Sequence, residues 1–245
     1  MPPRHRLIAE LIRRSIARGE LGAAGAVLSL AELAERFGSS EDVRLALVRL
    51  QSDGLIVLQG ERGAVVSESP MLAQFMSTPA GSAKPELTRD ETFLDEAQRL
   101  GLAAANRSET RIEQASLEVA DQLEIAVRTP IVHRQVVRCA NDGPVALEHA
   151  YYPYDVMPSA DPAVDARTLL EAAGYRRVGW IDTVVARQAS REEASALALD
   201  ARSPLLDHGR VLYSRNGDHV RPVAYVRTLF VASRHRLIYD HKYKG

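Results

Sequence analysis

The most constraining feature of the sequence is a pair of short amphipathic segments joined through a glycine and followed by two apolar runs. Apolar residues recur at spacings of three and four over residues 30–37 and again over 43–50, with Gly38 between them. This spacing predicts two helices, and the glycine supplies a left-handed turn residue. The apolar runs at 55–58 and 64–66 flank a glycine-containing loop, which predicts a β-hairpin. Helix, tight turn, helix and hairpin in this order are typical of a winged helix-turn-helix unit.

A further helix is expected before this unit. Its inward stripe is formed by Leu7, Ile8, Leu11, Ile12 and Ile16. Ser29 is placed to cap the helix at 30–37, and Ser39 or Ser40 to cap the next. A unit of this kind lays its last helix into the major groove of DNA, so the sequence predicts a DNA-binding region.

Composition limits what the 245-residue chain can do. The formal net charge of −1 gives no overall attraction to polyanions, so DNA affinity requires a local basic surface. The lone Cys139 excludes an internal disulfide and most cysteine-based metal sites. The sequence contains no signal-like segment and no run of about eighteen apolar residues, which predicts a cytoplasmic protein without a membrane segment.

Three motifs follow one another near the N-terminus: Leu33-Ala34 with Phe37-Gly38, Val43-Arg44 with Ala46-Leu47, and Gly60 with Gly63. Over residues 4–68 this series resembles the GntR family of bacterial regulators. The resemblance implies that residues 1–68 are a winged helix-turn-helix DNA-binding domain. It also implies a set of DNA contacts from Ser29, Ser40, Arg44, Arg62 and Gly63.

The start of the predicted recognition helix departs from the family pattern. Ser40 is followed by Glu41 and Asp42, where the family has a basic residue, and residues 1–68 hold nine arginines and nine acidic residues. Carboxylates at a helix N-terminus stabilise the helix but repel phosphate. Two interpretations remain open. Either a carboxylate accepts a hydrogen bond from a cytosine amine in an unusual operator, or the domain no longer binds DNA.

Residues 69–90 are rich in proline, glycine and small polar residues, which predicts an interdomain linker. Beyond the linker, helices are expected near residues 91–101, 117–123, 168–173 and 191–198. Strands are expected near residues 109–115, 131–139, 145–152, 181–187, 205–214 and 220–231. Long strands that follow one another predict an antiparallel sheet with helices packed against it, so the expected fold class is α+β.

A second resemblance covers this region. Matching segments occur in order at residues 131–138, 141–153, 169–175, 192–197 and 221–234. They resemble the UTRA effector domain of the HutC branch of GntR regulators. The resemblance implies that residues 91–245 form a domain of chorismate lyase-like fold that binds a small metabolite.

The predicted effector-binding residues are Arg138, Glu148, Tyr225, Arg227 and Arg234. Arg138 and Glu148 match the family's basic and acidic ligand-facing positions. A guanidinium suits a carboxylate or phosphate, and an opposing carboxylate can accept an amine or hydroxyl, so an anionic metabolite is expected. The alternative for this pair is a cross-strand salt bridge. His149 is expected to be structural, on the opposite sheet face from Glu148.

We find no catalytic motif in the sequence, no phosphate-binding loop and no metal-ligand spacing, so no cofactor, metal or catalytic residue is predicted. The sequence therefore predicts a ligand-responsive transcription regulator, acting as a homodimer on a palindromic operator, as a repressor. The alternative is a relative that has lost DNA binding and serves as a metabolite-binding protein or a lyase or isomerase.

Overall fold

The computed structural model describes residues 3–60, 63–67, 71–76, 89–141, 143–158 and 166–239. The chain folds as two compact units. The first combines residues 1–104 with 233–245, and the second comprises residues 105–232. The domain boundaries expected from the sequence, at residues 68 and 91, stay predictions.

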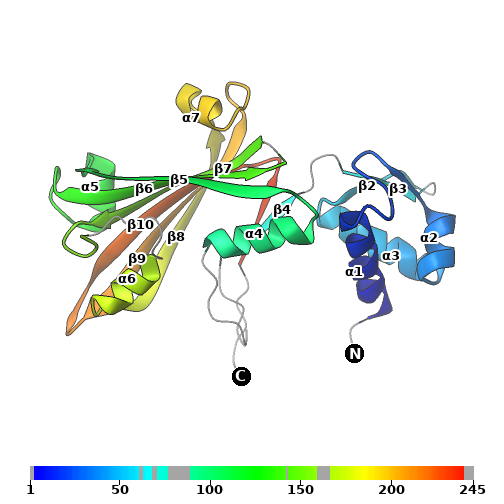
Figure 1. Ribbon diagram of the computed structural model, residues 1–245, viewed down its shortest axis with the longest axis horizontal. Helices are drawn as coiled ribbons and strands as arrows, with labels where there is room; N and C mark the ends of the chain where they lie inside the picture. Colours follow the sequence, from blue (N-terminus) through cyan, green and yellow to red (C-terminus); the bar gives the residue numbers. More distant parts are fainter. Residues whose placement is uncertain are drawn as a thin grey trace. The chain divides into compact units, whose positions relative to one another are not determined.

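The first unit contains the helices and hairpin predicted near the N-terminus (Figure 1). Its elements are α1 (Arg4–Ala17), β1 (Val27–Ser29), α2 (Leu30–Phe37), α3 (Ser40–Ser52), β2 (Ile56–Leu58), β3 (Gly63–Val66), β4 (Leu72–Phe75), α4 (Arg89–Arg99) and β11 (His235–Ile238). Strand β3 lies between β1 and β2 in a small antiparallel sheet. Strand β1 was not expected from the sequence, because three residues are too few to show an alternating pattern.

Helix α1 is anchored by three buried isoleucines: Ile8, Ile12 and Ile16. The sequence-based assignment of Leu7 and Leu11 to the inward stripe is wrong, because these side chains are 53% and 48% exposed. The buried stripe instead continues through Arg13. Its guanidinium is drawn inward by ion pairs to Glu10 and to Asp53, the C-cap of α3.

Strands β4 and β11 pair in parallel although they lie far apart in the sequence. The Leu72 amide donates to the Arg234 carbonyl at 2.7 Å, and the Met76 amide donates to that of Ile238 at 2.8 Å. The Arg236 guanidinium then donates to the Ser52 carbonyl at 2.7 Å, at the end of α3. The C-terminal strand is thus part of the unit that holds the predicted recognition helix.

The second unit is built on one large sheet (Figure 1). Its elements are β5 (Ala104–Gln114), α5 (Leu117–Leu123), β6 (Pro130–Ala140), β7 (Gly143–Pro153), α6 (Ala166–Ala172), β8 (Arg176–Gln188), α7 (Arg191–Ala196), β9 (Pro204–Asn216) and β10 (His219–Val231). The strand order is β5-β6-β7-β10-β9-β8, and the pairs from β6 to β8 are antiparallel. The predicted α+β class is confirmed.

Helices cover both faces of this sheet. Val119, Ala120 and Leu123 of α5 pack on one face, which we call the α5 face. Helix α7 packs on the same side through Ala194 and its C-cap residue, Leu197. Helix α6 packs on the opposite face, the α6 face, where Leu169 contacts a cluster that includes Tyr152 and Val226. Because successive strand residues point to opposite sides, neighbours in the sequence contribute to different faces.

Candidate functional site

The predicted recognition helix α3 presents a mixed basic and apolar surface. Val43, Ala46, Leu47 and Leu50 are buried against the first unit's core. The outward side carries Glu41, Arg44, Leu45, Val48 and Arg49. Ser40, the first residue of the helix, is exposed, and Ser39 caps the helix by accepting a hydrogen bond from the Asp42 amide at 3.2 Å.

The two acids at the start of α3 have different surroundings. The Asp42 carboxylate accepts a hydrogen bond from the Ser39 hydroxyl at 2.8 Å and lies 3.8 Å from the Arg4 guanidinium. Glu41 is exposed in the first turn of the helix. Asp42 therefore belongs to the capping structure, and Glu41 is the acid whose charge most directly opposes a phosphate.

The other predicted DNA contacts lie around the hairpin. Ser29 is the N-cap of α2 and is half-buried, without a side-chain capping bond. Gly63 has a φ of +117°, and a Cβ there would lie 1.9 Å from the Leu28 carbonyl oxygen, so pairing of β1 with β3 requires glycine. Arg62 lies outside the described residues. The roles of these positions in DNA binding stay predictions.

On the α6 face, a row of buried polar side chains crosses the middle of the sheet. Glu148 of β7 lies opposite Thr228 of β10, which lies opposite His208 of β9. The Glu148 carboxylate accepts hydrogen bonds from the Thr228 hydroxyl and from Arg138 of β6, both at 3.1 Å. These four side chains belong to residues that are no more than 8% exposed. We call them the polar row.

The polar row continues to the sheet edge through Asp182 of β8 and Arg210 of β9. Two hydrogen bonds of 2.6 and 2.7 Å join their carboxylate and guanidinium, and the His208 Nε2 lies 3.4 Å from Asp182. Burial alone would raise the pKa of Asp182, but the hydrogen bonds from Arg210 and His208 outweigh it and hold that pKa well below its usual range. Arg210 also stacks over the Trp180 ring at 5.1 Å.

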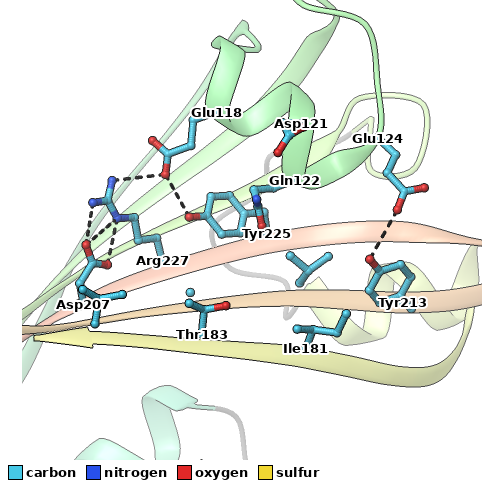
Figure 2. Close-up of a pocket in the computed structure, with 13 residues that line it drawn as sticks. Glu118, Asp121, Gln122, Glu124, Ile181, Thr183, Asp207, Tyr213, Tyr225 and Arg227 are labelled. Carbon is cyan, nitrogen blue, oxygen red and sulfur yellow. Dashed lines mark hydrogen bonds and ion pairs between the residues drawn. The ribbon is translucent and has the colours of Figure 1, made fainter.

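The α5 face carries an open cavity of about 320 Å³ between α5 and strands β8 to β10. Figure 2 shows the side chains of α5 along one side and those of β8 across from them. The lining residues are Glu118, Asp121, Gln122, Glu124, Ile181, Thr183, Val185, Asp207, Gly209, Val211, Tyr213, Tyr225 and Arg227. The cavity thus combines an acidic side with an apolar and aromatic one.

Tyr225 and Arg227 define one end of this cavity. The Asp207 carboxylate accepts hydrogen bonds from two nitrogens of Arg227, at 2.7 and 3.0 Å for the closest pairs, and from the Arg187 Nε at 2.6 Å. These bonds to Asp207 raise the pKa of Arg227 despite its partial burial. Glu118 accepts the Tyr225 hydroxyl at 3.1 Å and lies 3.5 Å from Arg227 (Figure 2).

Beside the cavity, on the same face, His133, His149 and Tyr151 form a stack that reaches Tyr225. The His133 Nε2 and His149 Nδ1 lie within hydrogen-bonding distance, at 2.9 Å. Burial, assisted by repulsion from His133, lowers the pKa of His149 to about 4. His149 therefore packs on the face opposite Glu148, as the sequence predicted.

The structure does not bring the five predicted effector residues together. Arg138 and Glu148 contact each other on the α6 face, whereas Tyr225 and Arg227 line the cavity on the α5 face. Strand β10 ends at Val231, and Arg234 lies in the turn before β11, within the first unit. Burial lowers the pKa of its guanidinium.

Several polar residues of the α6 face were missed by sequence reasoning. Thr228, His208, Asp182 and Arg210 join the polar row only through the pairing of β7, β10, β9 and β8. The available signal was alternation: Thr228 follows Arg227, and His208 follows Asp207, so each pair must divide between the two faces.

Residues 99–236 match the UTRA domain family, and residues 5–66 match the family of bacterial regulatory proteins called gntR. The chain belongs to the UTRA-containing GntR regulators. The order of the two matches along the chain confirms both resemblances drawn from its motifs. This GntR/UTRA protein is a ligand-responsive transcription regulator, in which the GntR region serves DNA binding and the UTRA domain serves effector binding.

Two known transcription regulators are similar to this chain over most of their length. The chain is 28% identical over 244 residues to the uncharacterized HTH-type transcriptional regulator RB1450 of Rhizobium meliloti (strain 1021), covering 95% of this chain and 92% of that protein. It is 27% identical over 227 residues to the HTH-type transcriptional repressor NagR of Bacillus subtilis (strain 168), covering 88% of each.

The fold is shared with a solved structure of PhnF from Mycobacterium smegmatis. The TM-score is 0.73, with 23% identity over 97% of this chain and 99% of that one. Among the residues that the structure describes, no cluster of histidine, cysteine or acidic side chains could hold a metal ion. No described helix combines the length and apolar character needed to cross a membrane.

Proposed function

We propose that this regulator binds a small anionic metabolite at the Arg138 end of the polar row. The observation that supports the proposal is the row itself. Arg138, Glu148, Thr228 and His208 are polar groups held in the middle of a sheet, where burial costs free energy unless hydrogen bonds compensate it. A ligand carboxylate or phosphate could pair with the Arg138 guanidinium in place of Glu148, while Glu148 accepts a hydrogen bond from a ligand amine or hydroxyl.

Ligand binding at this point has a direct chemical consequence for the row. An anion that pairs with Arg138 competes with the Glu148 carboxylate, which lies 3.1 Å from the guanidinium. The same carboxylate accepts the Thr228 hydroxyl, so the anion also changes the acceptor of Thr228. Thr228 lies on β10, and the chain continues from β10 to β11 in the first unit. Differential binding to two arrangements of β10 would couple the effector to DNA affinity.

The test uses conservative variants, because truncation of a buried ion pair would also lower the stability of the protein. Arg138→Lys and Glu148→Gln are compared with Arg227→Lys, a matched change on the α5 face. A panel of phosphate and carboxylate metabolites, with inorganic phosphate as the simplest probe, is screened by calorimetry. We expect a hit that loses affinity by about tenfold in the first two variants and not in the third. Equal binding to all proteins would exclude the polar row.

For the DNA-binding region, we propose that a homodimer reads a palindromic operator through α3 and acts as a repressor. Two-fold symmetry of the protein matches two half-sites one helical turn apart. The exposed basic side of α3, with Arg44 and Arg49, supports this role, as does the wing, which is expected to contribute Arg62.

Replacing Arg44 by alanine should weaken operator binding by about 1–3 kcal/mol, because a base or phosphate contact is lost. Fluorescence anisotropy on DNA from upstream of the coding sequence measures this, and light scattering gives the mass of the complex. Arg191→Ala, at the exposed start of α7, removes the same charge as a control.

Glu41→Gln should raise the non-specific affinity for DNA, because a carboxylate that repels phosphate is lost. Failure of the unmodified protein to bind such DNA would favour the alternative without DNA binding.

We further infer that the protein is not an enzyme. A regulator releases its effector unchanged, whereas a lyase or isomerase would consume it. The identified effector is incubated with substoichiometric protein and analysed by mass spectrometry, and we expect full recovery. A transformed product, lost in Glu148→Gln, would overturn this inference and give Glu148 a role in proton transfer.

A further inference from the structure

The cavity on the α5 face is a separate place from the polar row. Strands β9 and β10 contribute to both, but through alternate residues that point to opposite sides. Arg227 and Asp207 face the cavity, whereas Thr228 and His208 belong to the polar row. A molecule in the cavity therefore cannot contact the side chains that the proposed function assigns to the anionic effector.

The charges at the Arg227 end of the cavity are already balanced. Two guanidiniums, of Arg187 and Arg227, meet the carboxylates of Asp207 and Glu193, and the Arg187–Glu193 pair is held by two bonds of 2.7 Å. A ligand anion would have to displace one of these carboxylates. The cavity is therefore poorly suited to a phosphate or carboxylate group.

Among the described residues that line the rest of the cavity, the carboxylates of α5 outnumber the cationic side chains. Glu118 is shared between the Tyr225 hydroxyl and the Arg227 guanidinium, which lies 3.5 Å away. Among the described residues, Asp121 and Glu124 have no arginine or lysine within ion-pair distance, and the Glu124 carboxylate accepts a hydrogen bond from the Tyr213 hydroxyl at 3.5 Å (Figure 2). Both are exposed, so a ligand can approach them from solvent.

The opposite side of the cavity is apolar. Ile181 and Val185 of β8 are 58% and 50% exposed, although both are large aliphatic side chains. Val211 and the rings of Tyr213 and Tyr225 complete this side. Tyrosine faces attract alkylammonium groups, and exposed aliphatic side chains gain by covering a hydrocarbon chain.

We propose that this cavity is a second ligand site and that it takes an aliphatic amine. Ammonium groups of the amine pair with Asp121 and Glu124, and the hydrocarbon chain lies along Ile181, Val185 and Val211. A volume of about 320 Å³ accommodates a small metabolite of this kind. The site is independent of the anionic effector, since no residue of the polar row lines it.

The experiment uses the full-length protein and 1,5-diaminopentane as the probe, with binding followed by calorimetry. Two matched compounds, 1,5-pentanediol and glutarate, keep the chain length while removing or reversing the charge. We expect only the diamine to bind. The double variant Asp121→Asn/Glu124→Gln should bind the diamine about three- to tenfold more weakly, because two exposed ion pairs are lost.

A control double variant, Glu192→Gln/Asp200→Asn, removes two exposed carboxylates elsewhere in the second unit and should bind the diamine like the unmodified protein. Equal weakening in both double variants would show non-specific charge attraction and overturn the proposal, as would equal affinity for the diol. Ile181→Lys tests for a different occupant. If it halves the mass in light scattering while the unmodified protein fails to bind the diamine, a second copy covers the cavity and the proposal is wrong.

Discussion

The two faces of the large sheet hold their arginine–carboxylate pairs in different surroundings. Both hold arginines paired with carboxylates on the central strands. On the α6 face, Arg138 and Glu148 are almost fully buried and share their bonds with Thr228. On the α5 face, the Arg227 side chain is 29% exposed, and Asp207 bonds a second guanidinium, that of Arg187.

The difference indicates that the stability lost when a charged side chain is removed depends on its surroundings more than on its residue type. A buried pair has lost its hydration and depends on each partner, whereas a half-exposed network keeps water and alternative partners. Single substitutions in the polar row are therefore expected to be costly, and those in the half-exposed network of Arg227, Asp207 and Arg187 are expected to be tolerated. Three predictions test this contrast, from the largest effect to the smallest.

The strongest test removes one arginine from each face. Arg138→Ala should lower the free energy of unfolding by about 3–5 kcal/mol, because Glu148 is left as a buried charge without this partner. Arg227→Ala should cost about 1 kcal/mol, since Asp207 keeps Arg187 and gains water. Urea denaturation followed by circular dichroism measures both values.

The double variant Arg138→Met/Glu148→Leu serves as the control, because replacing both partners by apolar groups removes the unpaired charge. It should recover most of the stability lost in Arg138→Ala. Equal costs for the two arginine variants would contradict the contrast between the faces.

The second test uses pH. His149 has a folded-state pKa of about 4, below its ordinary 6.5, because of burial and the neighbouring charges of His133, Arg227 and Arg111. Its contribution to stability is complete above pH 6.5. Between pH 6.5 and about 4 the unfolded chain binds a proton that the folded chain does not, so the free energy of unfolding falls, by on the order of 1–3 kcal/mol.

His149→Gln removes this titration, and we expect a flatter dependence of the urea midpoint on pH in the same range. His133 keeps some slope, because burial also lowers its pKa. His219→Gln, at the exposed start of β10, should follow the unmodified protein. If the His149→Gln profile coincides with that of the unmodified protein, His149 does not contribute to this pH dependence.

The smallest effect comes from one substitution made on both faces. Thr228→Val deletes the buried hydroxyl that donates to Glu148 and should cost about 1–2 kcal/mol. Thr183→Val, in the exposed floor of the α5-face cavity, should change stability by less than about 0.5 kcal/mol. Differential scanning calorimetry compares the two, and a larger cost at position 183 would reverse the expected order.

Much of the fold could be predicted because its helices and long strands carry strong local patterns. The predicted helix at 117–123 coincides with α5, and the predicted strands at 131–139 and 220–231 lie within β6 and β10. Strands β4 and β11 were missed. Each has four residues, and their pairing is between segments far apart in the sequence, which no local pattern reports.

The candidate site was predicted less completely. The family motifs led to Arg138 and Glu148, which the structure joins, and strand alternation correctly placed His149 on the other face. His208 and Asp182 could not be assigned to that neighbourhood, because their position depends on the register between β8, β9 and β10. The effector contacts themselves stay predictions.

The pairing of β11 with β4 has a consequence for synthesis of the protein. Residues 72–75 leave the ribosome long before residues 235–238, and Arg236 reaches the end of α3, at Ser52, across 184 positions of the chain. The N-terminal unit therefore cannot complete its contacts during translation until the large sheet has been made. A nascent chain would acquire its finished DNA-binding unit only together with the domain that controls it.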